Sequence, residues 1–342
     1  MGSGGAHDRT LDYVPALDGI RAVAVGLVLL AHFGGEPFRG GAYGVDIFFV
    51  LSGFLITSIL LRQSAAGRVN LLGFYSRRLI RLMPALVVVV ALTWWPATLL
   101  RDAGLVARDS IMSLTYTIAW PIEFGDAFGS HLGHIWSLCV EEWFYLGWPL
   151  ILLLLLRFQR GIIPPLVAAS AAFAIMVLAW RWYAGNGISS YILSGFGIVL
   201  GCVLALLLSR WKPRAPWWAG PVAVAIIGAM VVLNGLHVGS VFTRVAVDAA
   251  AAILIWALIT RRDAFSGLFS ARPLVSAGKV SYELYLWHYP LWALLPALFG
   301  PAGWWAALIG TFVAAYATHY GLLSLQDRLR RVAPRQFVAL PA

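Results

Sequence analysis

An arginine and a histidine stand at the two ends of one apolar stretch, Arg21-Ala-Val-Ala-Val-Gly-Leu-Val-Leu-Leu-Ala-His32. Ionisable side chains are expensive in hydrocarbon, so two of them in one stretch indicate a functional site. If the stretch is helical, Arg21 and His32 lie roughly 16 Å apart along its axis. One of them is then able to serve each face of a membrane.

Carboxylates occur at the depth expected for His32. Asp46 begins the second apolar stretch, and Glu141 and Glu142 lie near the start of the fourth. Because both stretches run back from the face where the first one ends, we expect His32 to converge with Asp46 and one glutamate. Successive helical residues differ by about 100° in direction, which leaves open whether Glu141 or Glu142 faces the interior.

Basic residues mark the opposite face. Arg78 and Arg81 are three residues apart, on one helical face at the inner mouth of the third apolar stretch. Guanidinium groups at a helix entrance are suited to phosphate. Ordinary anchoring at the membrane surface is an equal alternative for Arg77 and Arg78, but Arg81 lies deeper and is harder to explain as an anchor.

Further histidines are weaker candidates for chemistry. His288 lies at mid-depth in the ninth stretch, where its ring can bond a neighbouring helix or backbone freed by Pro290. His131 and His134 have the spacing of metal ligands, but a zinc site needs three or four ligands and no further ligand cluster is present. We therefore expect no metal.

The composition explains how these residues are held. The chain is 61% hydrophobic and 12% charged, with a mean hydropathy of +0.81, whereas soluble domains carry about 25% charged residues. Its apolar runs lack the alternation of a membrane β-barrel and suit spans of about 20 helical residues. We predict an all-α polytopic membrane helix bundle, a single domain over residues 1–342. The ten predicted spans are 14–33, 44–62, 79–100, 135–156, 162–182, 188–208, 217–236, 241–260, 280–299 and 303–324.

The net charge of +10 is a topology signal rather than a sign of nucleic-acid binding. Most of the 25 lysine and arginine residues fall in alternate connections between the spans, and the opposite connections hold only Arg39, Arg101 and Arg108. Basic residues accumulate on the cytoplasmic side. We therefore expect both termini in the cytoplasm and anionic lipid as a partner of the basic loops.

The remaining motifs favour structural roles. Cys139 and Cys202 fall in different spans, so no disulfide framework is expected. Gly197 and Gly201 form a small-residue face that permits close helix packing. The first span lacks a cleavage site, and we interpret it as an uncleaved helix.

Five motifs taken in order resemble the acyltransferase 3 family of integral membrane O-acyltransferases, across essentially the whole chain. They are Leu17-Asp18-Gly19-Ile20-Arg21 with His32; Gly44-Val45-Asp46 through Ser52-Gly53-Phe54; Arg78-x-x-Arg81-x-x-Pro84; Trp136-Ser137-Leu-Cys-Val-Glu141; and Ser281-Tyr282 through His288. Trp143, where relatives often have glutamine, and Glu283, at a place usually small or polar, depart from the pattern.

The resemblance implies a membrane enzyme that moves an acyl group, commonly acetyl, from cytosolic acyl-CoA to a hydroxyl. Arg78 and Arg81, with Arg21, would bind the donor phosphates. His32 would act as general base, oriented by Asp46 or Glu141. Whether the reaction passes through a covalent acyl-histidine intermediate is left open.

The acceptor is expected to be a carbohydrate or cell-envelope glycan on the outer face of the inner membrane. A small molecule such as a macrolide is the alternative within the same chemistry. The other motif residues, expected to contact substrate, are Trp136, Ser137, Glu142, Tyr282 and His288. A proton-coupled transporter is the alternative from another class, since ionisable groups within spans also build proton relays; against it, no duplicated half is visible.

Overall fold

Long apolar runs become helices because a backbone in hydrocarbon must satisfy its own hydrogen bonds. The computed structural model describes residues 13–123, 130–159, 162–185, 195–211, 213–238, 240–332 and 338–339. Its elements are α1 (Pro15–Phe33), η1 (Glu36–Tyr43), α2 (Gly44–Ala65), β1 (Arg68–Val69), α3 (Leu71–Thr98), α4 (Ala103–Leu114), α5 (Ala119–Glu123), η2 (Gly133–Ile135), α6 (Trp136–Gln159), α7 (Ile163–Gly185), α8 (Phe196–Arg210), α9 (Ala219–Gly235), α10 (Val241–Thr260), α11 (Ala264–Phe269), α12 (Arg272–Lys279), α13 (Ser281–Phe299), α14 (Ala302–Val332) and β2 (Val338–Ala339).

The chain is an all-helical bundle with membrane-spanning character. Six of the described helices are long and apolar enough to cross a membrane, and three shorter apolar helices, within α7, α8 and α9, accompany them. A helix lies in each of the ten predicted ranges. The beginning of the sixth range, residues 188–194, lies outside the described residues. The number of spans and the cytoplasmic placement of the termini stay predictions.

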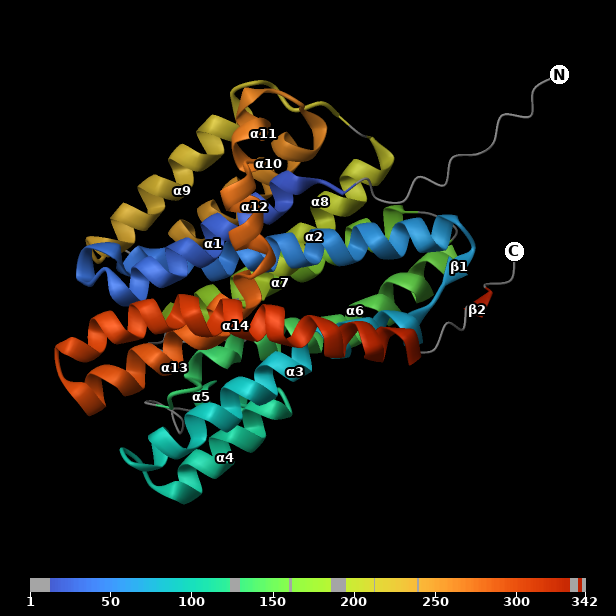
Figure 1. Cartoon of the computed structure of the whole chain (residues 1–342). Coiled ribbons are helices and arrows are strands. Elements are labelled where there is room, and N and C mark those ends of the chain that lie inside the picture. The colour runs from blue at the N-terminus through green and yellow to red at the C-terminus, as the bar shows by residue number, and fades with distance from the viewer. Residues whose placement is uncertain are drawn as a thin grey trace.

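Two helices form the centre of the bundle. α1 and α2 run between α9 and α10 on one side and α3, α13 and α14 on the other (Figure 1). Apolar side chains pack in two main clusters, one toward α10 and one toward α13. The residues of α1 and α2 therefore meet neighbours on both sides.

Small residues set the spacing of α2 and α8. A Cβ at Gly53 would overlap the carbonyl oxygen of Ile198, and one at Gly201 would overlap that of Val50. Glycine at both positions lets the two backbones touch. The expected packing role of Gly201 is confirmed, and Gly197 packs against the carboxylate of Asp248.

Helix α3 begins earlier than its apolar run. Asn70 accepts a hydrogen bond from the Gly73 backbone N–H at 2.7 Å and caps the helix. The cap starts the helix at Leu71, eight residues before the predicted span. Arg77, Arg78 and Arg81 therefore project from well-formed helical turns.

The C-terminal part of the chain returns to the connection between α2 and α3. β1 and β2 pair antiparallel, with Val69 opposite Val338, beside the far end of α2 (Figure 1). This contact places residues 338–339 at the same end of the bundle as the start of α3.

Candidate active site

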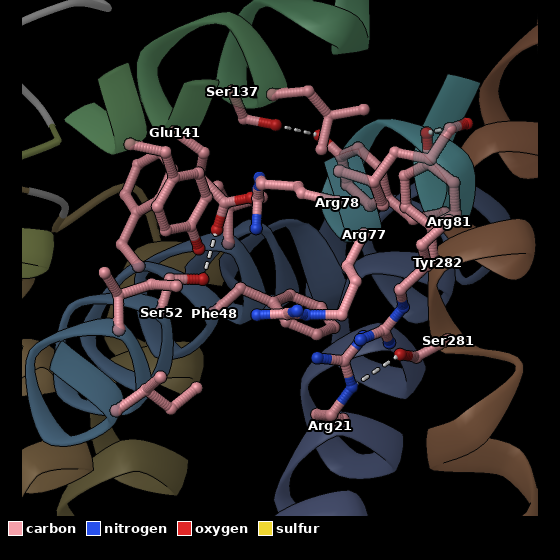
Figure 2. A pocket seen from close by; sticks show the side chains of 18 of the residues that line it. Arg21, Phe48, Ser52, Arg77, Arg78, Arg81, Ser137, Glu141, Ser281 and Tyr282 are labelled. Atoms are coloured by element: carbon pink, nitrogen blue, oxygen red, sulfur yellow. Dashed lines mark hydrogen bonds between the residues drawn. The ribbon is translucent and has the colours of Figure 1, made fainter. Parts of the chain in front are cut away.

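A cavity of about 340 Å³ lies where the first turns of α1, α3, α6 and α13 meet the middle of α2 (Figure 2). Its apolar wall includes Phe48 and Phe49. Its polar lining residues are Arg21, Ser52, Arg77, Arg78, Arg81, Ser137, Glu141, Tyr145, Ser281, Tyr282 and Tyr285.

Four guanidinium groups and one carboxylate face this cavity, which makes it strongly cationic. Within the described part of the chain, the side chains of Arg77 and Arg81 have no hydrogen-bonding or ion-pair partner. Both point into the cavity in Figure 2. The sequence left Arg77 open between membrane anchoring and phosphate binding, although its separation of four residues from Arg81 puts the two on one helical face.

The other two arginines are held by protein groups. Arg21 Nε donates to Ser281 Oγ at 3.2 Å and to Gly278 O at 3.3 Å. Arg78 donates from Nε and Nη2 to Glu142 Oε1, at 2.8 and 2.7 Å, and its guanidinium lies 3.3 Å from the centre of the Tyr145 ring. The side chains of Arg21 and Arg78 are thus held in position before any ligand binds.

The two glutamates of α6 have different surroundings. Glu141 lines the cavity and accepts a hydrogen bond from Ser52 Oγ at 2.5 Å. Glu142, expected at the substrate, instead pairs with Arg78 and is not among the residues that line the cavity. Because adjacent residues of a helix point about 100° apart, Glu141 faces the cavity and Glu142 faces Arg78.

The far end of the cavity is closed by hydroxyl groups. Ser137 Oγ and Tyr285 Oη lie 2.6 Å apart, and Tyr285 Oη donates to the backbone carbonyl of His134 at 2.8 Å. Tyr282, also in the lining, donates to Leu82 O at 3.0 Å. Trp136 packs against Phe49 and is not a lining residue.

A cluster of three histidines lies behind that wall. The ring centre of His288 is 4.9 Å from that of His32 and 5.2 Å from that of His134. His134 and His288 are buried, and His32 is half-buried. Tyr289 and Trp292 complete the wall around His32, each with its ring centre 5.3 Å away.

Backbone carbonyls orient two of these histidines. His32 Nδ1 lies 2.9 Å from Val28 O, and His288 Nδ1 lies 2.5 Å from Tyr285 O. Since a carbonyl only accepts, Nδ1 carries the hydrogen in both rings and Nε2 carries a lone pair. The Val28 carbonyl holds the position that we expected a carboxylate to have.

Asp46 pairs with an arginine of α10 and not with a histidine. It receives a hydrogen bond from Arg244 Nη1 at 2.7 Å, and Asp248, one turn along α10 from Arg244, is fully buried with both oxygens unpartnered. The expected convergence of Asp46 with His32 is therefore not observed, because a buried carboxylate pairs with the nearest cation. The position of Arg244 inside a predicted span was the available signal.

Of the two histidines with the spacing of metal ligands, His134 lies in the cluster and His131 stands apart from it. His131 is buried beside Arg101 and Asp109, and burial together with Arg101 lowers its pKa to about 4. Both of its ring nitrogens lack a hydrogen bond. Across the described ranges, no three His, Cys, Asp or Glu side chains gather as metal ligands, and Cys139 and Cys202 are free and buried.

Comparison with known proteins fits this arrangement. A family profile described as an acyltransferase domain matches residues 14–320, which include the cavity and the three histidines. The chain belongs to the acyltransferase 3 family. It is therefore related to enzymes that transfer acyl groups other than aminoacyl groups.

Two curated relatives are similar over most of this chain. The chain is 32% identical to the peptidoglycan O-acetyltransferase OatA of Listeria monocytogenes, over 82% of this chain and 49% of the relative. It is 29% identical to the O-acetyltransferase OatA of Staphylococcus aureus, over 96% of this chain and 59% of the relative. The chain thus spans about half the length of these relatives. No solved structure gives a significant match.

Proposed function

We propose that the protein is a multi-pass enzyme of the inner membrane that transfers an acetyl group from cytosolic acetyl-CoA to a hydroxyl of a cell-envelope glycan. The observation that carries the proposal is the cationic cavity, whose far wall adjoins a histidine with a free Nε2 lone pair. The names of the relatives, both O-acetyltransferases, support the choice of acetyl as the acyl group.

The donor would enter from the arginine side. Arg77 and Arg81 have no hydrogen-bonding or ion-pair partner in the described ranges and are available to phosphate, for which charge-assisted hydrogen bonds are strong. Arg21 and Arg78 add fixed positive charge. The apolar wall at Phe48 and Phe49 suits the pantetheine arm, so the thioester would lie at the Ser137 and Tyr285 end of the cavity.

The acceptor would react at His32. Its Nε2 takes the proton of the attacking hydroxyl, a new C–O bond forms at the acyl carbon, and the C–S bond breaks. The thiolate leaves with the electron pair and recovers the proton from His32 as free coenzyme A. A metal ion is not part of this proposal.

The acceptor class is proposed from the relatives, one of which is named as acting on peptidoglycan. The aromatic rings of Tyr289 and Trp292 beside His32, and that of Trp304 next to Trp292, offer faces on which a sugar ring can pack. A macrolide-type acceptor would use the same chemistry and is the second candidate.

A transfer assay tests the proposal. Purified protein receives acetyl-CoA labelled in the acetyl group, together with glycan fragments from de-O-acetylated peptidoglycan. We expect labelled ester on the glycan, and a fall of roughly 100-fold or more in His32→Asn. The matched control is His237→Asn, an exposed histidine with φ of 60°, a conformation that asparagine tolerates.

Two results of the assay would count against the proposal. Activity retained by His32→Asn would remove His32 as the base. No labelled glycan from the wild type, with active transfer to a macrolide, would replace the glycan by the second candidate.

A further inference from the structure

Among the described residues, one carboxylate lines the cationic cavity, and only one of its two oxygens is in use. Glu141 Oε1 accepts a hydrogen bond from Ser52 Oγ at 2.5 Å (Figure 2). In the same part of the chain, Glu141 Oε2 has no hydrogen-bonding partner, and neither oxygen forms an ion pair with an arginine. Oε2 is not one of the fully buried unpartnered oxygens. It is therefore open toward the cavity.

The arginines of the cavity do not explain this carboxylate. Arg78 takes its charge partner from Glu142, and Arg21 is held by Ser281 Oγ. A negative charge that faces a phosphate site weakens the binding of phosphate by repulsion. A carboxylate oxygen that is removed from water also costs free energy, unless a donor group pairs with it. Both costs are offset when the substrate donates an N–H or O–H group to Glu141 Oε2.

The position of Glu141 indicates which substrate group that is. On α6, Glu141 lies one helical turn, about 6 Å along the axis, from Ser137 at the closed end of the cavity. In coenzyme A, two methylene groups separate the thioester sulfur from the nearest amide N–H, a reach of roughly 4 Å. The second amide and the hydroxyl of the pantetheine arm lie farther toward the phosphates. With the thioester against Ser137, the nearest amide therefore comes level with Glu141.

We propose that Glu141 is a binding residue for the donor, and that its Oε2 accepts a hydrogen bond from the amide N–H of coenzyme A nearest the thioester. The inference rests on the proposed function and deepens it, because it assigns recognition of the pantetheine arm to one side chain. The bond from Ser52 fixes the carboxylate, and the bond from the amide then fixes how far the arm extends along α6. Glu141 thereby holds the thioester at the Ser137 and Tyr285 end of the cavity.

This role differs from the one expected of a carboxylate beside His32. His32 Nδ1 is oriented by the carbonyl of Val28, so the ring does not depend on Glu141. A charged acceptor forms a stronger hydrogen bond with an amide than a neutral acceptor does. The carboxylate thus reads the amide of the donor, and the guanidinium groups bind its phosphates.

A donor analogue tests the contact. In this analogue an ester oxygen replaces the amide N–H nearest the thioester of acetyl-CoA, which removes the donated hydrogen and keeps the phosphates and the acetyl group. For the wild type we expect kcat/KM for the analogue to be roughly tenfold to a hundredfold below that for acetyl-CoA. Glu141→Leu should use acetyl-CoA about as poorly as the wild type uses the analogue, and should not distinguish the two donors.

Two further variants complete the experiment. Glu141→Gln keeps an oxygen acceptor without its charge, so we expect an intermediate preference for the amide donor. Asp327→Asn, which removes an exposed carboxylate of α14, is the matched control and should keep the full preference. Each variant is assayed as the whole chain in detergent, with the glycan fragments described above as acceptor.

The outcomes separate this role from the proposed function. Equal kcat/KM for both donors in the wild type would overturn the contact and leave acetyl-CoA as the donor. A full amide preference retained in Glu141→Leu would also overturn it. If Glu141→Leu does not fold, a full preference in Glu141→Gln overturns it instead. A wild type that transfers acetyl from neither donor would overturn the proposed function and this role with it.

Discussion

Arg78 and Arg81 lie on neighbouring turns of α3, but among the residues that the structure describes only Arg78 forms an ion pair with a carboxylate. We predict that Arg81→Gln raises the KM for acetyl-CoA roughly tenfold to a hundredfold, because it removes charge-assisted hydrogen bonds to phosphate worth about 1.5–3 kcal/mol. Its thermal stability should change little. Steady-state kinetics at varied donor concentration measure the effect, with exposed Arg272→Gln as the control.

Arg78→Gln should behave differently, because it leaves Glu142 partly buried without its cation. Removing one member of a buried ion pair costs about 3–5 kcal/mol, somewhat less at this partial exposure. We predict a clear loss of thermal stability in detergent for Arg78→Gln. A stable Arg78→Gln protein with only a raised donor KM would show that the ion pair with Glu142 is dispensable for the fold.

The two aspartates near Arg244 allow a similar test. Asp46 is bonded to Arg244, whereas Asp248 is buried with both oxygens unpartnered. Two carboxylates beside one guanidinium leave one surplus negative charge if both are ionised. We therefore predict that Asp248→Asn unfolds at the wild-type temperature or above, and that Asp46→Asn is destabilised. Thermal unfolding of both variants measures this, and the reverse order would refute the pairing.

At the level of helices, contact between α2 and α8 holds the cavity wall that carries Ser52. We predict that Gly53→Ala and Gly201→Ala lower the unfolding temperature, because each added Cβ overlaps a backbone carbonyl of the other helix. Gly228→Ala, where a Cβ meets nothing within 4 Å, is the matched control. Equal unfolding temperatures for all three variants would contradict the close packing.

The helices themselves were largely predictable from the sequence. Apolar length and the absence of alternation indicated a helix in each of the ten ranges. The start of α3 was missed, because the Asn70 cap adds residues 71–78, in which Gly73, Arg77 and Arg78 interrupt the apolar run. The short helices α11 and α12 were missed for a different reason: they are too short for an apolar period to stand out.

The candidate site was predictable only in part. Ordering the residues by their expected depth in the membrane grouped Arg21, Arg78 and Arg81, and all three line the cavity. It failed for Asp46 because a depth estimate does not specify which neighbouring helix a side chain faces. The pairing of Asp46 with Arg244 and the clustering of His134 with His288 join residues far apart in the chain. A single sequence carries no direct record of such contacts.

At the level of the whole molecule, the proposed donor and acceptor chemistries lie at different depths. Arg21 is in the second turn of α1 and His32 in its last turn. The two are roughly 16 Å apart along the axis. The hydroxyl wall of Ser137 and Tyr285, and His288 behind it, lie between the cavity and His32. The central claim is that one protein joins a donor from one face of the membrane to an acceptor from the other.

Sealed proteoliposomes test that claim most directly. Labelled acetyl-CoA is trapped inside the vesicles, and glycan fragments are supplied outside. We predict labelled glycan ester outside intact vesicles that contain the wild type. For vesicles that contain His32→Asn, we predict only a background level of labelled glycan. We also predict little transfer when donor and acceptor are confined to the same side. Efficient transfer with both on one side, and none across the membrane, would contradict the account.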